Sequence, residues 1–374
     1  MANAEDIAYY TRVLQNNNGV RIVTWMFGII AIPSNLIIIL WIAYNYCQNG
    51  LLHRYFRHRN SFNLNPSFAF LLFNLAVSDL LGGSYLLILA ISDATYTISQ
   101  NFSNISYLRI HPSVDTWIIS PTCSVERFLA QTSLIISILI TFVITLDRYL
   151  AVFYSASTRY RISVFQAQVT LAVFWTIGII LAILGAVDSY SISLKKPGHY
   201  SILGHLCQLE GSSTFIINAL TYLDMTVGIG VNIVIAILYI AILIRLKRHR
   251  QSIQRRKSPI ERHIQVITAW IIITSVVTWI PVIVWVIIQR AMTPVEFDDR
   301  ENFLLPILVI MLYSNTALNP LIPVIIKILV TSRLHNLFTS RTDVTPSQSR
   351  DKMNVVVITT TIIPKVIASD SANV

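Results

Sequence analysis

Charged residues are scarce in this chain. Only 12% of its 374 residues are Asp, Glu, Lys or Arg, while 54% are hydrophobic. A soluble globular domain carries about twice that fraction of charge. The composition therefore excludes an ordinary soluble protein and indicates a protein that lies in a membrane.

Two further absences narrow the class of membrane protein. All eight histidines lie outside the long apolar runs, and no Cys or Asp cluster has the spacing of metal ligands. A seven-helix zinc hydrolase of the progestin and adiponectin receptor type would need histidines inside the membrane, so we expect no enzyme.

The sequence also shows no internal repeat, whereas a transporter is expected to contain inverted repeats around a midplane site. A transporter is the alternative hypothesis, and solute flux in proteoliposomes would support it.

Seven apolar runs are long enough to cross a bilayer, which takes about 20 helical residues. The runs are 22–46, 68–91, 123–152, 167–187, 215–244, 264–288 and 303–326. They predict an all-α membrane protein with a seven-helix domain over residues 22–326. A short outer segment without a cleavable signal is predicted for residues 1–21. A short amphipathic helix on the inner leaflet is predicted for residues 327–338, followed by a disordered tail at 339–374.

Lys and Arg gather in alternate loops between these runs. The first, third and fifth loops are basic, and residues 245–262 alone contain eight Lys or Arg, whereas the sixth loop is acidic. Because short basic loops stay in the cytoplasm, the N-terminus is predicted to lie outside. The net charge of +10 then reflects topology, and we expect no nucleic-acid partner.

Two features on the predicted outer side agree with this orientation. Asn101 and Asn104 each begin an N-glycosylation tripeptide in the loop after the second run. Of the three cysteines, Cys123 and Cys207 lie on the outer side and Cys47 on the cytosolic side. Because the exterior is oxidising, this pattern favours a Cys123–Cys207 disulfide over three free thiols.

Polar and aromatic residues recur inside the runs in a fixed order. They are Asn35, the stretch 74–79 (NLAVSD), Cys123, Asp147-Arg148-Tyr149, Trp175, Tyr239, Trp279, Pro281, Asn315, Asn319 and Pro320. In order and spacing they resemble the residues of rhodopsin-like (class A) G-protein-coupled receptors. Residues 74–93 are also similar to the transmembrane module of relaxin and glycoprotein-hormone receptors, although the leucine-rich-repeat ectodomains of those receptors are not found in this sequence.

The resemblance implies a sodium pocket in the middle of the membrane. A charged residue inside a span is costly and therefore indicates a function. The implied ligands, beneath Trp279, are Asp79, Ser137, Asn315 and Asn319. The alternative is a protonated Asp79 in a hydrogen-bonded core with water.

The resemblance also implies a coupling site at the cytoplasmic face. Its residues are Asp147, Arg148, Tyr149, Tyr239 and Glu261. Arg148 can pair with Asp147 or with Glu261, and exchange of such a partner makes a two-state element. Trp279, Pro281 and Pro320 are the expected hinge residues, since proline removes a helix hydrogen bond.

Three positions depart from the family pattern. Pro323 stands where the family has the tyrosine that contacts Tyr239 on activation, Val231 replaces a proline, and Ser275 replaces a phenylalanine. The central packing switch of the family is therefore expected to survive only at Ile138. Activation should depend more on Arg148 and Glu261, and a receptor that does not couple is a second alternative.

The ligand class is narrowed by what two positions hold. Tyr313 occupies the place of the retinal lysine, which argues against an opsin, and Ala130 occupies the place of the aspartate in amine receptors. The candidate ligand-binding residues are Glu126, Asp224, Trp279 and Tyr313. Asp224 has no basic neighbour in sequence, whereas Glu126 either faces the bundle or lies exposed beside Arg127. A peptide, a small protein or a non-amine small molecule remains as the expected ligand, and the acidic residues at these outer positions favour a peptide.

We therefore predict a multi-pass receptor in the plasma membrane. Its expected partners are an extracellular ligand, a heterotrimeric G protein, membrane lipid and, after phosphorylation of Ser347, Ser349 and Thr359, arrestin. Sodium is the one ion expected to modulate it.

Overall fold

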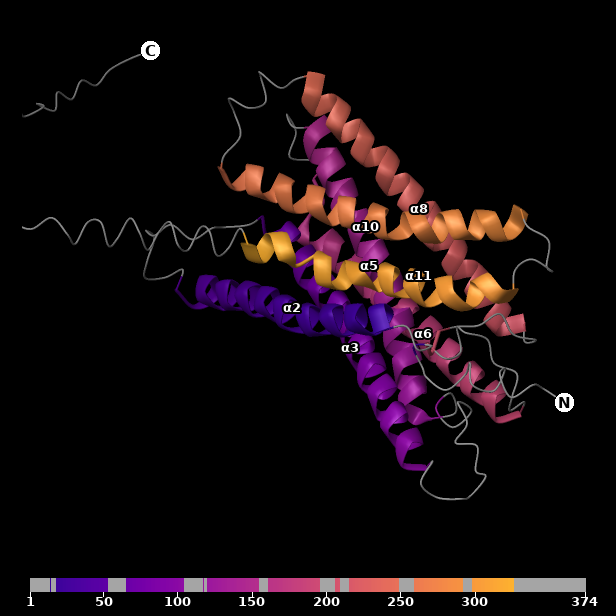
Figure 1. Ribbon diagram of the computed structural model, residues 1–374. Helices are drawn as coiled ribbons and strands as arrows, with labels where there is room; N and C mark the ends of the chain where they lie inside the picture. Colours follow the sequence, from indigo (N-terminus) through magenta and orange to yellow (C-terminus); the bar gives the residue numbers. More distant parts are fainter. Residues whose placement is uncertain are drawn as a thin grey trace, which may run out of the picture. The chain divides into compact units, whose positions relative to one another are not determined.

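The computed structural model describes Leu14, Trp117 and residues 18–52, 65–103, 120–154, 161–195, 206–208, 215–248, 259–291 and 298–325. All of them belong to one compact unit, Met1–Ile328. Its helices are α2 (Asn18–Leu52), α3 (Pro66–Ser103), α5 (Pro121–Phe153), α6 (Val164–Lys195), α8 (Phe215–Arg248), α10 (Pro259–Ala291) and α11 (Asp298–Leu318) (Figure 1). Each of these seven helices, or its continuation at residues 321–325, supplies a candidate membrane span. The predicted all-α seven-helix fold is confirmed.

Side-chain caps determine where two of the helices begin. Ser120 is the N-cap of α5, and its hydroxyl accepts a hydrogen bond from the Cys123 amide at 3.1 Å. Pro121 follows in the first turn, where its missing N–H costs nothing. At the start of α6, Ser163 and Gln166 form a capping box in which each side chain accepts from the other's backbone amide, at 3.2 and 2.9 Å. The cap of α5 places Cys123 in the first turn of that helix.

Most helices extend beyond the predicted runs, and two helix ends change the place of a predicted residue. α3 continues to Ser103, so Asn101 lies in its last turn and the prediction that places it in a loop is wrong; Asn104 lies outside the described residues. Polar residues continue the helix there because a formed helix gains one backbone bond for each added residue. α11 ends at Leu318, and a turn at Asn319 and Pro320 separates it from further helix at residues 321–325. Pro320 interrupts the helix since it has no N–H to donate.

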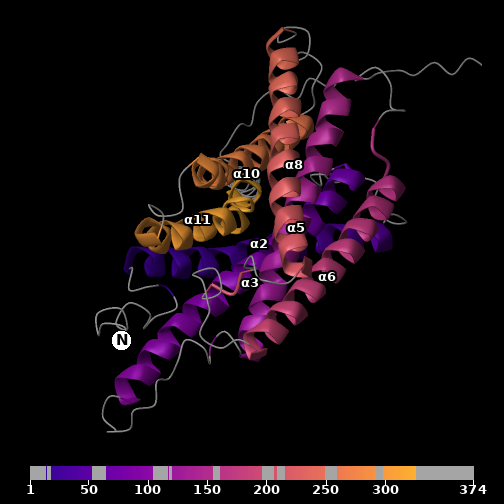
Figure 2. The same ribbon diagram turned by 90° about the vertical axis from the view of Figure 1, so that its right-hand side faces the viewer.

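α5 is the central helix of the bundle. In its most apolar stretch 72% of the residues are buried, against 22% in α8. α5 packs against α3, α6, α8 and α10, and Figure 2 shows α8 running beside α5 and α6. The outer faces of α6 and α8 carry large exposed apolar side chains such as Ile177, Ile180, Ile233 and Ile237. Such faces suit contact with lipid, since these helices are apolar on all sides.

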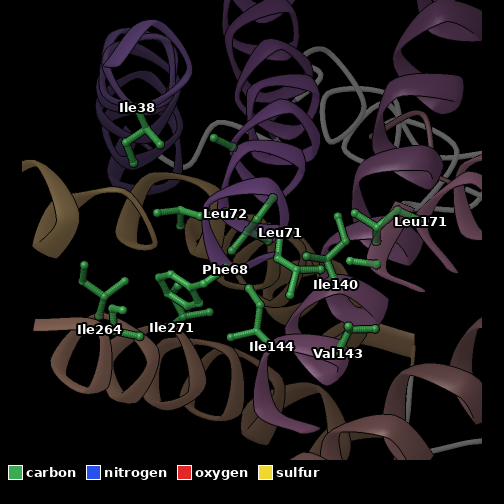
Figure 3. Packing of buried hydrophobic residues seen from close by; sticks show 14 of the residues in the cluster. Ile38, Phe68, Leu71, Leu72, Ile140, Val143, Ile144, Leu171, Ile264 and Ile271 are labelled. Carbon is green, nitrogen blue, oxygen red and sulfur yellow. The ribbon is translucent and has the colours of Figure 1, made fainter. Parts of the chain in front are cut away.

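A hydrophobic cluster joins five helices in the half of the bundle nearer the predicted cytoplasmic face. Figure 3 shows it as the side chains Ile38, Phe68, Leu71, Leu72, Ile140, Val143, Ile144, Leu171, Ile264 and Ile271. Phe68 of α3 is fully buried within it. Because protein interiors are closely packed, the cluster fixes the positions of α3, α5 and α10 beneath the charged residues at the inner face.

Candidate functional site

The inner end of α5 carries the residues predicted to couple to a G protein. Arg148 Nε donates to Asp147 Oδ2 at 3.0 Å, and a second guanidinium nitrogen donates to the same oxygen. The guanidinium carbon lies 5.1 Å from the centroid of the Phe68 ring, and Tyr149 stacks on Phe153 at 4.4 Å between ring centroids. Of the two predicted partners of Arg148, Asp147 is in contact with it.

The second predicted partner, Glu261, lies in the first turn of α10, but its side chain is outside the described part of the chain. The same holds for the Cys47 side chain, and for the whole of residues 327–338 and 339–374 with Ser347, Ser349 and Thr359. Tyr239 packs against a cluster that contains Ile138 and Trp279.

The buried carboxylate of Asp79 is the centre of the mid-membrane site. Ser137 Oγ donates to Asp79 Oδ1 at 3.0 Å, and Asn319 Nδ2 donates to Asp79 Oδ2 at 2.8 Å. The Asn319 amide oxygen accepts a hydrogen bond from the Thr274 hydroxyl at 2.9 Å. Four helices, or the turn after one of them, therefore meet through the chain Ser137–Asp79–Asn319–Thr274.

Asn315 lies beside a small cavity next to this chain. The cavity is lined by Ser133, Leu134, Ser137, Ile138, Ser275, Trp279, Leu312, Tyr313, Asn315 and Thr316. The Asn315 side-chain oxygen is buried and has no hydrogen-bond partner among the described residues. An oxygen atom with this surrounding is available to a bound cation or water.

The residues at Asp79 fit a monovalent cation. Hard cations take oxygen ligands, and the oxygens present here are those of Asp79, Ser137 and Asn315. In this conformation Asn319 turns its nitrogen, not its oxygen, toward Asp79. Within the described ranges no group of three or more His, Cys, Asp or Glu could hold a metal, so a cation here would meet one carboxylate and neutral oxygens.

Trp279 lies in α10 two residues before Pro281, which is also inside that helix. It packs with Ile138, Ile235 and Ile272. Gly228 of α8 faces its ring, and a Cβ at that glycine would lie 2.2 Å from Trp279 Cη2. A glycine is therefore required for α8 to approach this close.

Ser275, one of the three departures from the family pattern, has a partner that the sequence did not reveal. Its hydroxyl donates to the Asn232 side-chain oxygen of α8 at 3.3 Å, and Asn232 donates in turn to the Gly228 carbonyl at 2.9 Å. A polar contact therefore joins α8 to α10 where the family has packed apolar residues. The rotation of each helix about its axis decides this contact, and the composition of an all-apolar helix leaves that rotation open.

The candidate ligand-binding residues lie in the outer half of the bundle. Gln131 of α5 donates to Asp224 of α8. Glu126 is fully buried beside Ser92 and Arg127, so the alternative in which it lies exposed is wrong. Glu126 is therefore withdrawn from solvent on this side, whereas Asp224 is half-buried.

A disulfide holds a short segment over these residues. The predicted Cys123–Cys207 bond is confirmed. On either side of Cys207, the Leu206 carbonyl accepts from Tyr85 at 2.9 Å and the Gln208 side chain accepts from Tyr313 at 3.3 Å. The rings of Tyr85 and Tyr313 lie 4.7 Å apart between centroids. The segment 206–208 thus links α3, α5 and α11 above the bundle.

The start of the chain contributes to the same region, which sequence reasoning missed. Leu14 is fully buried against this outer cluster, and its amide donates to Asp93 Oδ1 at 3.0 Å. Arg21 donates to Asp93 Oδ2 at 2.6 Å. The signal available in the sequence was a base at the start of one run and an acid at the outer end of the next.

This arrangement defines a seven-transmembrane receptor: a helical bundle whose central helix carries a disulfide at its outer end and a paired arginine at its inner end. The sequence pattern of the family described as "7 transmembrane receptor (rhodopsin family)" matches residues 51–322. The chain belongs to this family, whose members are receptors and not enzymes, and it is a multi-pass membrane protein. The predicted resemblance to rhodopsin-like receptors is confirmed.

Two similar proteins agree with this assignment. The G-protein coupled receptor GRL101 of Lymnaea stagnalis is 24% identical over 318 residues, which are 83% of this chain and 25% of that protein. The chain thus spans about a quarter of the length of that relative. The crystal structure of squid rhodopsin is similar with a TM-score of 0.53 and 18% identity, over 86% of this chain and 78% of that one. At this identity the likeness concerns the fold.

Proposed function

We propose that this receptor lies in the plasma membrane and converts binding of an extracellular ligand into activation of a heterotrimeric G protein. The observation that carries the proposal is the buried Asp147–Arg148 pair at the inner end of α5. Removing one partner of a buried ion pair costs about 3–5 kcal/mol unless another group receives the remaining charge. Arg148 is therefore held until a new partner arrives, as a two-state element requires.

Pro281 gives α10 a point about which its inner half can move. In the proposed active state this half of α10 moves away from α5 and Arg148 separates from Asp147. A G protein then binds between the inner ends of the helices. The eight basic residues within 245–262 supply a positive surface for the approach of an acidic partner. Ligand binding drives the change only by binding the open state more tightly than the closed one.

The outer half of the bundle favours a ligand with a basic group, such as a basic peptide. Asp224 accepts from the neutral Gln131 amide in this conformation. An ammonium or guanidinium group would make a charge-assisted bond to Asp224 in its place, and such bonds are roughly twice as strong as neutral ones. Glu126 adds a second acid on the same side.

The coupling proposal predicts a change in basal nucleotide exchange. We expect Glu261→Ala to raise exchange on at least one Gα protein above that of the wild type, because one acid that can retain Arg148 is lost. The measurement is GTP-analogue uptake on a panel of Gα proteins, in membranes with matched surface expression. Exchange no higher than in empty membranes, for either form and with any ligand tried, would indicate a receptor that does not couple.

The same assay tests the ligand class through Asp224→Asn, which keeps the shape of the side chain and removes its charge. A basic peptide that activates the wild type should need at least tenfold more concentration in this variant, while basal exchange stays unchanged. A ligand without any basic group that activates both forms equally would contradict the proposed ligand chemistry.

We also propose that sodium binds at Asp79 in the inactive state. An ion present at ten times its dissociation constant, and bound only by the folded state, adds about 1.4 kcal/mol of stability. Purified receptor should therefore unfold at a higher temperature in sodium chloride than in choline chloride of equal ionic strength. Asp79→Asn should abolish the difference. Asp93→Asn, which removes the acid paired with Arg21, should lower stability yet keep the sodium response. Equal unfolding of the wild type in both salts would favour the protonated, water-filled core instead.

A further inference from the structure

The inner half of α10 is attached to the end of α11 by two side chains. Trp270 Nε1 donates to the Leu318 carbonyl at 2.7 Å. Thr274 Oγ1 donates to the Asn319 side-chain oxygen at 2.9 Å. The two helices lie side by side (Figure 1). Residues 270 and 274 are four positions apart, so they occupy one face of α10 and bind neighbouring residues of the partner.

The acceptors exist because of how α11 ends. Leu318 is its last residue, and the final carbonyls of a helix have no N–H of their own helix to bind. In a membrane such a carbonyl must find another donor, since water is absent from the hydrocarbon region. The Trp270 indole supplies that donor, so the turn at Asn319 and Pro320 creates an attachment point for α10.

Both bonds are made by the part of α10 that moves about Pro281. Trp270 and Thr274 lie eleven and seven residues before the proline, about 16 and 10 Å along the helix, on the side toward the predicted cytoplasmic face. Movement of this half away from α11 has to break both bonds. The tyrosine that serves the family at this end of the seventh helix is replaced here by Pro323, which is buried.

We infer that Trp270 and Thr274 form a latch that holds the receptor closed, by binding α10 to the end of α11. The inference rests on the proposed function, because opening of α10 is the step that the latch opposes. The latch differs from the Arg148 switch because both of its hydrogen bonds join neutral groups. One of these groups, the Asn319 side chain, also donates to Asp79. Sodium at Asp79 and the latch would then favour the same closed state.

The test is Trp270→Phe, which removes the indole N–H and retains an aromatic ring. Interhelical hydrogen bonds in membranes contribute amounts equivalent to about a 3- to 18-fold change in an equilibrium. We expect the open-to-closed ratio to rise by that factor, and basal nucleotide exchange to rise in proportion while the open form is a minority. Thr274→Val, which keeps the volume and loses the hydroxyl, should act in the same direction and serves if the tryptophan variant does not fold.

Trp175→Phe is the matched control. Its indole donates to the Asn74 side chain at 3.1 Å and so joins α6 to α3. This bond does not involve α10. The substitution removes the same donor from another interhelical bond. We expect a loss of thermal stability with no rise in basal exchange.

A distance measurement separates this inference from the coupling proposal. Spin labels at Val266→Cys and Phe165→Cys, both at exposed positions near the inner ends of α10 and α6, report opening without a G protein. Cys47 is replaced by alanine in all forms so that it takes no label. Longer label distances in Trp270→Phe without any exchange would support the latch and contradict coupling. Unchanged distances in both Trp270→Phe and Thr274→Val would overturn the latch, whatever the exchange rate.

Discussion

Cys123→Ala and Cys207→Ala are each expected to remove most of the folded receptor from the cell surface. The disulfide joins residues 84 positions apart. The chain-entropy treatment of a cross-link gives about 4.5 kcal/mol for a loop of that length. Helices already inserted in a membrane restrict the unfolded chain, so we expect the free energy of unfolding to fall by about 2–4 kcal/mol. Since folded proteins are stable by only about 5–15 kcal/mol, this decrease is a large part of the total stability.

The loss should also loosen the outer site, because the segment 206–208 accepts hydrogen bonds from Tyr85 and Tyr313. The measurement is the surface fraction in cells together with the unfolding temperature of the purified protein. The double variant should be no less stable than either single variant, since all three lack the same bond. Cys47→Ala is the control and should match the wild type. Single cysteine variants that unfold at the wild-type temperature would contradict the structural role of this disulfide.

The sequence predicted the features that depend on composition and order along the chain. Run length and charge asymmetry were enough to place seven helices, because an apolar run of about 20 residues crosses a membrane as a helix. The disulfide followed from the side on which Cys123 and Cys207 lie. The contact of Asp79 with Ser137 and Asn319 was implied by resemblance, and these three residues are in direct contact.

The contacts that sequence reasoning missed all depend on the rotation of one helix relative to another. Thr274 binding Asn319 and Ser275 binding Asn232 both come from α10, which is apolar around most of its circumference. In soluble helices the polar face fixes this rotation, but in a lipid environment small residues and local packing decide it. The end of α11 could have been anticipated from Pro320, whereas the Trp270 donor at that end could not.

Gly228→Ala is expected to destabilise the receptor through a single methyl group. The added Cβ would lie 2.2 Å from Cη2 and 2.5 Å from Cζ3 of Trp279, distances that no packed structure accepts. Trp279 is itself nearly buried and packs against Ile138, Ile235 and Ile272, so its ring has little freedom to move away. Forcing extra volume into a packed core costs about 1–3 kcal/mol. Either α8 moves outward or the ring leaves its position.

Gly230→Ala provides the matched control on the same helix. No atom lies within 4 Å of the Cβ that would be added there. Since alanine is favoured over glycine inside a helix by about 0.5–1 kcal/mol, this variant should be as stable as the wild type or slightly more stable. The comparison of unfolding temperatures in detergent therefore separates steric conflict from helix propensity. Equal effects of the two substitutions would show that Gly228 does not contact Trp279.

A double-mutant cycle with Trp279→Phe tests the contact itself. Phenylalanine lacks the outer atoms of the indole, including those nearest to Gly228, so it vacates the space that the alanine methyl needs. Trp279→Phe alone leaves a cavity and should lower stability. Gly228→Ala combined with it should cost less than the sum of the two single changes, by about 1 kcal/mol or more, as expected for residues in contact. Additive effects would mean that α8 and α10 accommodate the methyl independently of Trp279, and the close approach of these helices would then have another cause.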